Sequence, residues 1–208
     1  MTVPRDKHKA DRVGSVKFAR LVSDVLSPPT MFAAIGLALA IHERPNISGV
    51  LWGVFFGLAV SLLPILFVVF MLKTGRIGDL HMSATQERHL PYIVAISAAA
   101  LALVLVVAGG GPAQLTCLAL FNIVVLILLG LINTRWLISI HATAAASTWL
   151  IAAFVFGWRV GFILLPLAVL VAWARLFLRR HTPAQVFAGL ALGLFTVLIF
   201  RQLGCFFP

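Results

Sequence analysis

Long hydrophobic runs alternate with short polar segments along almost the whole chain. A membrane-spanning helix needs about 20 apolar residues, with about 17 to 25 tolerated. Neither these runs nor their flanks show the period-two alternation of strands, and open sheets cannot span lipid. The pattern therefore predicts an all-α polytopic transmembrane helix bundle with about six to seven spans. The seven candidate runs cover about 25–41, 50–72, 91–108, 113–132, 142–158, 160–178 and 182–200.

Composition agrees with this interpretation. Hydrophobic residues make up 62% of the chain and charged residues only 11%, whereas a soluble domain carries about 25% charged residues. We expect an integral membrane protein with two parts. Residues 1–22 are predicted as a basic cytoplasmic N-terminal segment without the apolar core of a signal peptide, and 23–208 as a single transmembrane helical domain.

The basic residues are distributed unequally between the two sides of the predicted bundle. With seven spans, 13 of the 16 lysines and arginines fall on the side of the N-terminus. The positive-inside rule makes that side cytoplasmic, in what we expect to be a prokaryotic inner or plasma membrane. The net charge of +10 thus indicates topology and contact with membrane lipids, and no nucleic-acid partner is expected. The 13 are Arg5, Lys7, Lys9, Arg12, Lys17, Arg20, Lys73, Arg76, Arg88, Arg135, Arg175, Arg179 and Arg180.

Three polar clusters return to this basic side, at 73–91, 133–147 and 174–189. Helices that return to one side can bring His141, His181, Arg88 and Arg175 close together. Arg175 falls one turn inside a span, where a charge costs about 2.5–3.5 kcal/mol, so we interpret it as functional. Arg179 and Arg180 at the helix end are expected only to anchor the chain at lipid headgroups.

The spacing within these clusters resembles the type-2 phosphatidic acid phosphatase superfamily of membrane lipid phosphatases. The third motif of that family reads Arg175-x5-His181-x3-Gln185 here, and the second reads Ile138-Ser139-Ile140-His141. The first motif survives as Arg88, with His81 where the family has lysine. The resemblance covers about residues 50–200, in order and on one side of the membrane.

The resemblance implies the role of each site residue. His181 would be the nucleophile that forms a phosphohistidine, and His141 the general acid. Arg88 and Arg175 would hold the phosphate, helped by Ser139 at a helix N-terminus, where anions are favoured. Gln185 stands where the family has the aspartate that orients the nucleophile. The family uses no metal, and no cofactor is expected.

The same resemblance implies an integral membrane phosphatase acting on lipid phosphate monoesters or diphosphates. Candidate substrates are polyprenyl phosphates, phosphatidic acid and phosphatidylglycerol phosphate. The departures at His81, Ile140 and Gln185 support an alternative, in which the protein is catalytically silent. It would then bind lipid phosphate or serve as a structural subunit of a membrane complex. A homo-oligomer and a larger complex both stay open.

Overall fold

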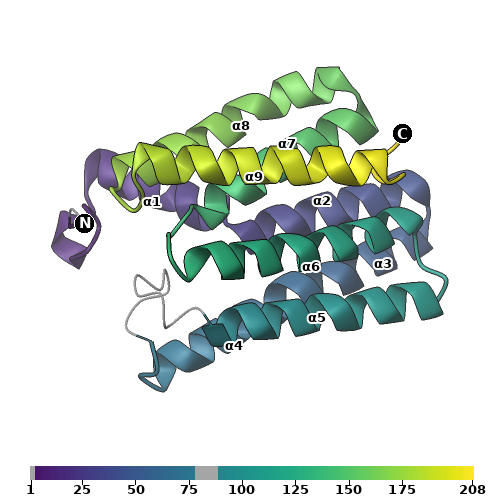
Figure 1. Ribbon diagram of the computed structural model, residues 1–208, viewed down its shortest axis with the longest axis horizontal. Coiled ribbons are helices and arrows are strands. Elements are labelled where there is room, and N and C mark those ends of the chain that lie inside the picture. Colours follow the sequence, from purple (N-terminus) through teal and green to yellow (C-terminus); the bar gives the residue numbers. More distant parts are fainter. Residues whose placement is uncertain (1–2, 78–88) are drawn as a thin grey trace. The chain divides into compact units, whose positions relative to one another are not determined.

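The computed structural model describes residues 3–77 and 89–208, and these residues form helices without any strand (Figure 1). The predicted all-α class is confirmed. A short 3-10 turn, η1 (Lys9–Asp11), precedes the first α-helix, and a π-helical turn, η2 (Leu58–Leu62), joins α3 to α4. The α-helices are α1 (Gly14–Val25), α2 (Pro28–Glu43), α3 (Ile47–Gly57), α4 (Leu63–Lys73), α5 (His89–Ala108), α6 (Ala113–Asn133), α7 (Ile140–Phe156), α8 (Trp158–Phe177) and α9 (Pro183–Gln202).

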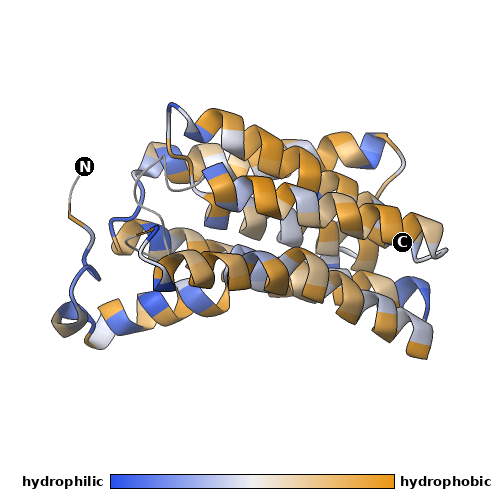
Figure 2. Cartoon of the chain, turned by 90° about the horizontal axis from the view of Figure 1, so that it is seen from below, coloured by the Kyte–Doolittle hydropathy of each residue, from blue (hydrophilic) through white to orange (hydrophobic). Residues whose placement is uncertain are grey.

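Hydrophobic residues run along most of these helices, and hydrophilic residues gather toward their ends (Figure 2). Five helices among the described residues are long and apolar enough to cross a membrane, the first being the continuous helix Ile47–Lys73. The bent pair of α1 and α2, with 46° between its halves, makes a sixth candidate. Fewer helices than the seven predicted runs are long enough, because α2 has only 16 residues and α7 only 17.

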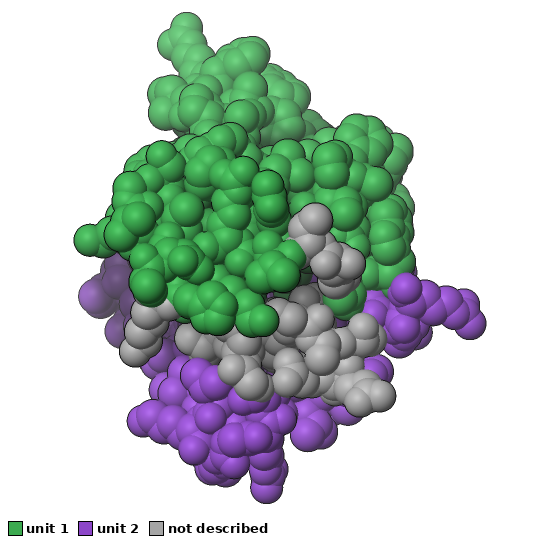
Figure 3. Space-filling view, turned by 90° about the vertical axis from the view of Figure 1, so that its left-hand side faces the viewer, with its two compact units in different colours: residues 1–31, 136–208 green, residues 32–135 purple. Residues whose placement is uncertain are grey.

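The chain divides into two compact units (Figure 3). We call residues 1–31 and 136–208 the first unit, and residues 32–135 the second unit. The first unit contains α1 and α7–α9, and it holds every predicted site residue except Arg88. It is therefore described in more detail.

In the second unit, polar groups fix the connection that leads into α6. The carboxylate of Glu43 accepts hydrogen bonds from the backbone N–H groups of Ala113, at 2.7 Å, and Gln114, at 2.8 Å. A carboxylate suits this place because the first N–H groups of a helix have no intrahelical acceptor and carry partial positive charge. Arg44 donates to the carbonyl oxygen of Gly110 in the same connection, at 2.7 Å.

In the first unit, α7 packs closely against α9 through two glycines. A Cβ atom on Gly189 would lie 2.5 Å from the carbonyl oxygen of Ser139. A Cβ atom on Gly193 would lie 2.5 Å from the carbonyl oxygen of Thr143 and 2.8 Å from Oγ of Ser147. The GxxxG spacing in α9 thus serves close helix packing, as such spacing does in membranes. The nearest atom to each added Cβ is a backbone carbonyl oxygen, which cannot move aside as the end of a flexible side chain can.

The other face of the first unit is formed where α1 packs on α8. Buried Ala19 and Val22 of α1 contact Ala174 and Leu178 at the end of α8. Residues 14–22 belong to the predicted basic N-terminal segment, and the structure shows that they are helical. The polar and apolar residues of α1 occupy different faces, and its small apolar residues fit against α8.

The packing of α7 on α9 leads to a test by single substitutions. Gly193→Ala inserts a methyl group against the Thr143 carbonyl, and overpacking of this kind typically costs about 1–3 kcal/mol. We expect the midpoint of thermal unfolding in detergent to fall accordingly. Gly130→Ala in α6 is the matched control, because its Cβ would meet nothing closer than Tyr92 Cγ, at 3.9 Å. Equal stability of the two variants would contradict the close packing.

Candidate functional site

Three segments that are distant in sequence meet at one end of the first unit. The backbone N–H of Arg5 donates to the carbonyl oxygen of Leu178 at 3.1 Å, which joins the N-terminal segment to the end of α8. The backbone N–H of Ser139 donates to the carbonyl oxygen of Gln185 at 3.1 Å, which joins the start of α7 to the start of α9. This end carries the residues of the second and third motifs.

His181 lies in the turn between α8 and α9 and is partly buried. Its Nδ1 lies 3.2 Å from the carbonyl oxygen of Leu137. A carbonyl oxygen can only accept a hydrogen bond, so Nδ1 must carry the proton that it donates. In the neutral ring the lone pair is then on Nε2, which is the form a nucleophilic imidazole needs. A main-chain carbonyl therefore fixes the tautomer, which is one task of the family's aspartate.

Ser139 and His141 occupy the start of α7. Ser139 is the N-cap residue, and its Oγ accepts a hydrogen bond from the backbone N–H of Ala142 at 3.3 Å. This hydrogen bond caps the helix and explains why it begins here. It also uses the oxygen of the hydroxyl group, and Ser139 is fully buried. His141 follows in the first turn and is 8% exposed. It lies four residues after Leu137, the residue whose carbonyl holds His181.

Gln185 stabilises the start of α9. Its Oε1 accepts from the backbone N–H of Thr182 at 2.9 Å, and its own N–H donates to Oγ1 of Thr182 at 3.3 Å. These reciprocal bonds form a capping box, in which glutamine serves as well as glutamate. The expected contact of Gln185 with the ring of His181 is taken by the Leu137 carbonyl instead.

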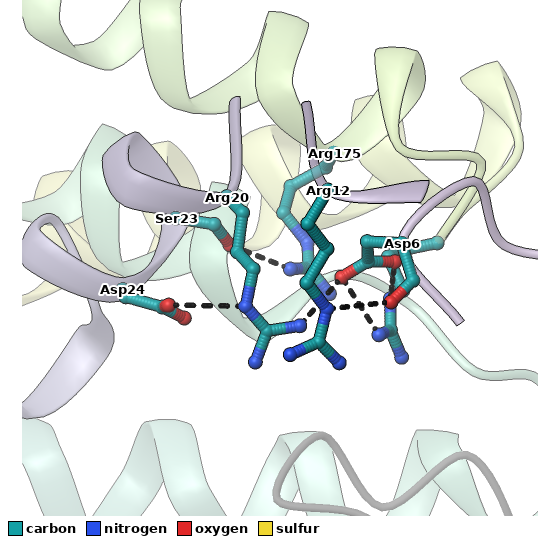
Figure 4. A network of polar contacts seen from close by, with 7 residues as sticks. Asp6, Arg12, Arg20, Ser23, Asp24 and Arg175 are labelled. Atoms are coloured by element: carbon teal, nitrogen blue, oxygen red, sulfur yellow. Dashed lines mark hydrogen bonds and ion pairs between the residues drawn. The ribbon is translucent and has the colours of Figure 1, made fainter. Parts of the chain in front are cut away.

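Arg175 lies in the last turn of α8 and is 3% exposed. Its Nη1 donates to Oγ of Ser23 in α1 at 2.7 Å, as Figure 4 shows. A buried guanidinium is costly unless hydrogen bonds satisfy it. This hydrogen bond links Arg175 to α1. Arg175 thus lies beside a network of polar residues from the N-terminal part of the chain (Figure 4).

The centre of this network is a buried carboxylate that the sequence analysis overlooked. Asp6 is completely buried, and both of its carboxylate oxygens accept from Arg180: Nε bonds Oδ1 and Nη2 bonds Oδ2, each at 2.9 Å. Arg20 of α1 also donates to Oδ2, at 3.1 Å (Figure 4). The expectation that Arg180 anchors the chain at headgroups is wrong, because its side chain is only 7% exposed and forms this ion pair. Arg179 is exposed.

Two residues of the first motif, Arg88 and His81, lie outside the described residues. Contacts between the starts of α7 and α9 bring together the other predicted site residues, His181, His141, Ser139 and Gln185. Arg175 approaches the same end from α8. Within 3–77 and 89–208, no three histidine, cysteine, aspartate or glutamate residues gather as they would around a metal ion.

Comparison of the chain with protein-family models, with curated proteins and with solved structures gives no match. The resemblance to the lipid phosphatases therefore depends on the motif residues themselves. Their arrangement in the first unit is the structural observation that bears on function.

The capping box predicts how substitutions of Gln185 affect stability. Gln185→Ala removes the acceptor of the Thr182 backbone N–H in a part-buried hydrogen bond, and the loss of such a bond typically costs about 0.5–1.5 kcal/mol. Gln185→Glu keeps the acceptor and places its charge at the positive end of α9, so we expect stability within about 1 kcal/mol of the parent protein. Chemical unfolding in detergent measures both. Exposed Gln202 at the end of α9 gives the control Gln202→Ala; a loss as large there would show that the capping box is unimportant.

Proposed function

We propose that this integral membrane protein is a phosphatase that hydrolyses lipid phosphate monoesters or diphosphates through a phosphohistidine on His181. The observation that carries the proposal is the hydrogen bond between Nδ1 of His181 and the carbonyl oxygen of Leu137. It gives the ring the tautomer of a nucleophile, although the family's aspartate is replaced by Gln185. The same segment, 137–141, carries His141 as a second imidazole.

The proposed reaction has two steps. Nε2 of His181 attacks phosphorus, and the N–P bond forms as the P–O bond to the leaving group breaks; the leaving group is the lipid alcohol of a monoester or the lipid monophosphate of a diphosphate. His141 gives its proton to the departing oxygen. Water then attacks phosphorus while His141 takes its proton, the N–P bond breaks, and inorganic phosphate leaves. Arginine suits the phosphate because it donates two parallel hydrogen bonds; Arg175 and Arg88 have this role by resemblance.

We place this site at the cytoplasmic side of the membrane, at headgroup level. Two features support the orientation: the excess of basic residues on the N-terminal side, and the meeting of the N-terminal segment with the α8–α9 turn at one end of the first unit. A lipid substrate could then keep its acyl or prenyl tail in the bilayer while its phosphate reaches His181. Exposed Phe187 on α9 supplies apolar surface directly after this turn.

A second candidate function is a catalytically silent lipid-phosphate binder or structural subunit. The observation that favours it is the use of the Gln185 side chain in the capping box. No charge from this residue then stabilises the imidazolium that forms during attack. In serine proteases, the change of the equivalent aspartate to its amide lowers kcat by about 10⁴-fold.

Phosphate release by the purified protein separates the two functions. The assay supplies phosphatidic acid, phosphatidylglycerol phosphate or a polyprenyl diphosphate in detergent micelles with EDTA. We expect release by the parent chain, background release by His181→Ala, and a loss of about 10²–10⁴-fold for His141→Ala, which removes a general acid. The matched control His42→Ala changes an exposed residue in the last turn of α2 and should leave the rate unchanged.

The result that contradicts catalysis is equal release by the parent chain and His181→Ala. Lipid binding by a parent chain that releases no phosphate would favour the silent binder. If His42→Ala loses activity as well, the effect of the histidine substitutions is a general loss of structure.

A further inference from the structure

We propose that Arg20 and Arg180 form a second oxyanion-binding site, distinct from the catalytic groups, which the carboxylate of Asp6 occupies in the resting chain. Its external ligand would be a phosphate monoester group, supplied by a lipid headgroup or by free phosphate. That ligand would take the place of Asp6 and release the N-terminal segment. The inference does not depend on catalysis, because binding can be measured whether or not the protein hydrolyses a lipid.

The geometry around Asp6 is that of an oxyanion site. Arg180 presents Nε and Nη2 to the two carboxylate oxygens, both at 2.9 Å, in the bidentate arrangement that guanidinium makes equally with phosphate. Arg20 adds Nη1 from α1 at 3.1 Å. The donors come from helix α1 and from the turn between α8 and α9, and they converge on one carboxylate that is fully buried.

The charges favour a more negative ligand than one carboxylate. Besides Arg20 and Arg180, Arg12 donates from Nε to the backbone carbonyl oxygen of Asp6 at 3.1 Å. Asp24 balances part of this charge through an ion pair with Arg20, at 3.5 Å (Figure 4). Three guanidinium groups thus face Asp6 and Asp24. A phosphate monoester carries about −1.5 to −2 charges at pH 7 and offers three acceptor oxygens.

Asp6 lies in a short N-terminal segment that can be displaced. It precedes the three-residue turn η1. Its links to the first unit include the Arg5 N–H bond to Leu178 and the Arg5 guanidinium over the Phe177 ring, 4.5 Å from the centroid. Lys7, beside Asp6, is exposed. Breaking such contacts would release the segment, whereas α1 would stay packed on α8 through Ala19 and Val22.

The position of the site indicates the source of its ligand. Arg180 directly precedes His181 and lies at the basic end of the first unit, where the helix α1 exposes Phe18 and Leu21. Exposed apolar residues next to basic residues are typical of a helix at the headgroup boundary. The phosphate of an anionic lipid can reach guanidinium groups at that level.

The test compares Asp6→Asn with Asp11→Asn in the full-length protein, with His181→Ala present in both so that phosphatidic acid is not hydrolysed, and purified in an uncharged detergent. Both variants lose one negative charge from the N-terminal segment, but the structure gives the contacts above to Asp6, and Asp11 is exposed. The probes are inorganic phosphate and dioctanoyl phosphatidic acid, with dioctanoylglycerol as the uncharged lipid. Calorimetry gives Kd, and the thermal midpoint shows whether the probe stabilises the fold.

We expect Asp6→Asn to bind phosphatidic acid about tenfold or more tightly than Asp11→Asn, since charge-assisted bonds to two arginines become available to the ligand. A gain for both anionic probes identifies the phosphate group as sufficient; a gain for the lipid alone identifies a headgroup at the membrane as the source. Adding Arg180→Gln to Asp6→Asn should remove the gain. Equal affinities of Asp6→Asn and Asp11→Asn would overturn the proposal.

The parent chain provides a measurement that does not depend on a variant folding. Trypsin should cleave after exposed Lys7 faster in saturating phosphatidic acid than in dioctanoylglycerol, because the ligand displaces the segment. Cleavage at the same rate in both lipids would show that Asp6 keeps its place and that the arginines serve only to hold the N-terminus.

Discussion

The first unit depends on the close approach of α7 to α9 at Gly189 and Gly193. Without side chains at these positions, the two helix backbones come within contact distance. This approach lets the backbone N–H of Ser139 reach the carbonyl of Gln185, and it places the residues before α7 beside the turn that carries His181. Helix packing of a kind common in membranes thus positions the candidate residues, and it brings the Leu137 carbonyl oxygen to the ring of His181.

At the N-terminal side of this unit, buried charged groups are stabilised by polar partners. Buried guanidinium groups are costly unless they are paired, and a partner removed from such a pair leaves an expensive charge behind. Asp6 supplies the partner for Arg180, and Ser23 supplies an acceptor for Arg175. Residues from the first 25 positions therefore complete the polar surroundings of the α8–α9 turn. These contacts join the basic N-terminal part of the chain to the candidate site.

The sequence predicts the helical class, because the length of the hydrophobic runs determines it. The Thr182–Gln185 capping box has a recognisable signature, although the third motif drew attention to Gln185 for another reason. The Leu137 carbonyl leaves no such signature, since every residue has one and only tertiary packing selects it. The same holds for Asp6, whose arginine partners lie 14 and 174 residues away. The basic segment 1–22 contains two acids, Asp6 and Asp11, and only tertiary packing distinguishes the buried one from the exposed one.

The central claim is that His181, held by a main-chain carbonyl, is the group that accepts phosphate. The most direct measurement is to quench the purified protein during turnover of phosphatidic acid labelled with ³²P and to map the label by mass spectrometry under alkaline conditions, in which phosphohistidine survives. The account predicts label on the peptide that contains His181, and none in His181→Gln. Label on His141, or turnover without any labelled peptide in the parent chain, would contradict it.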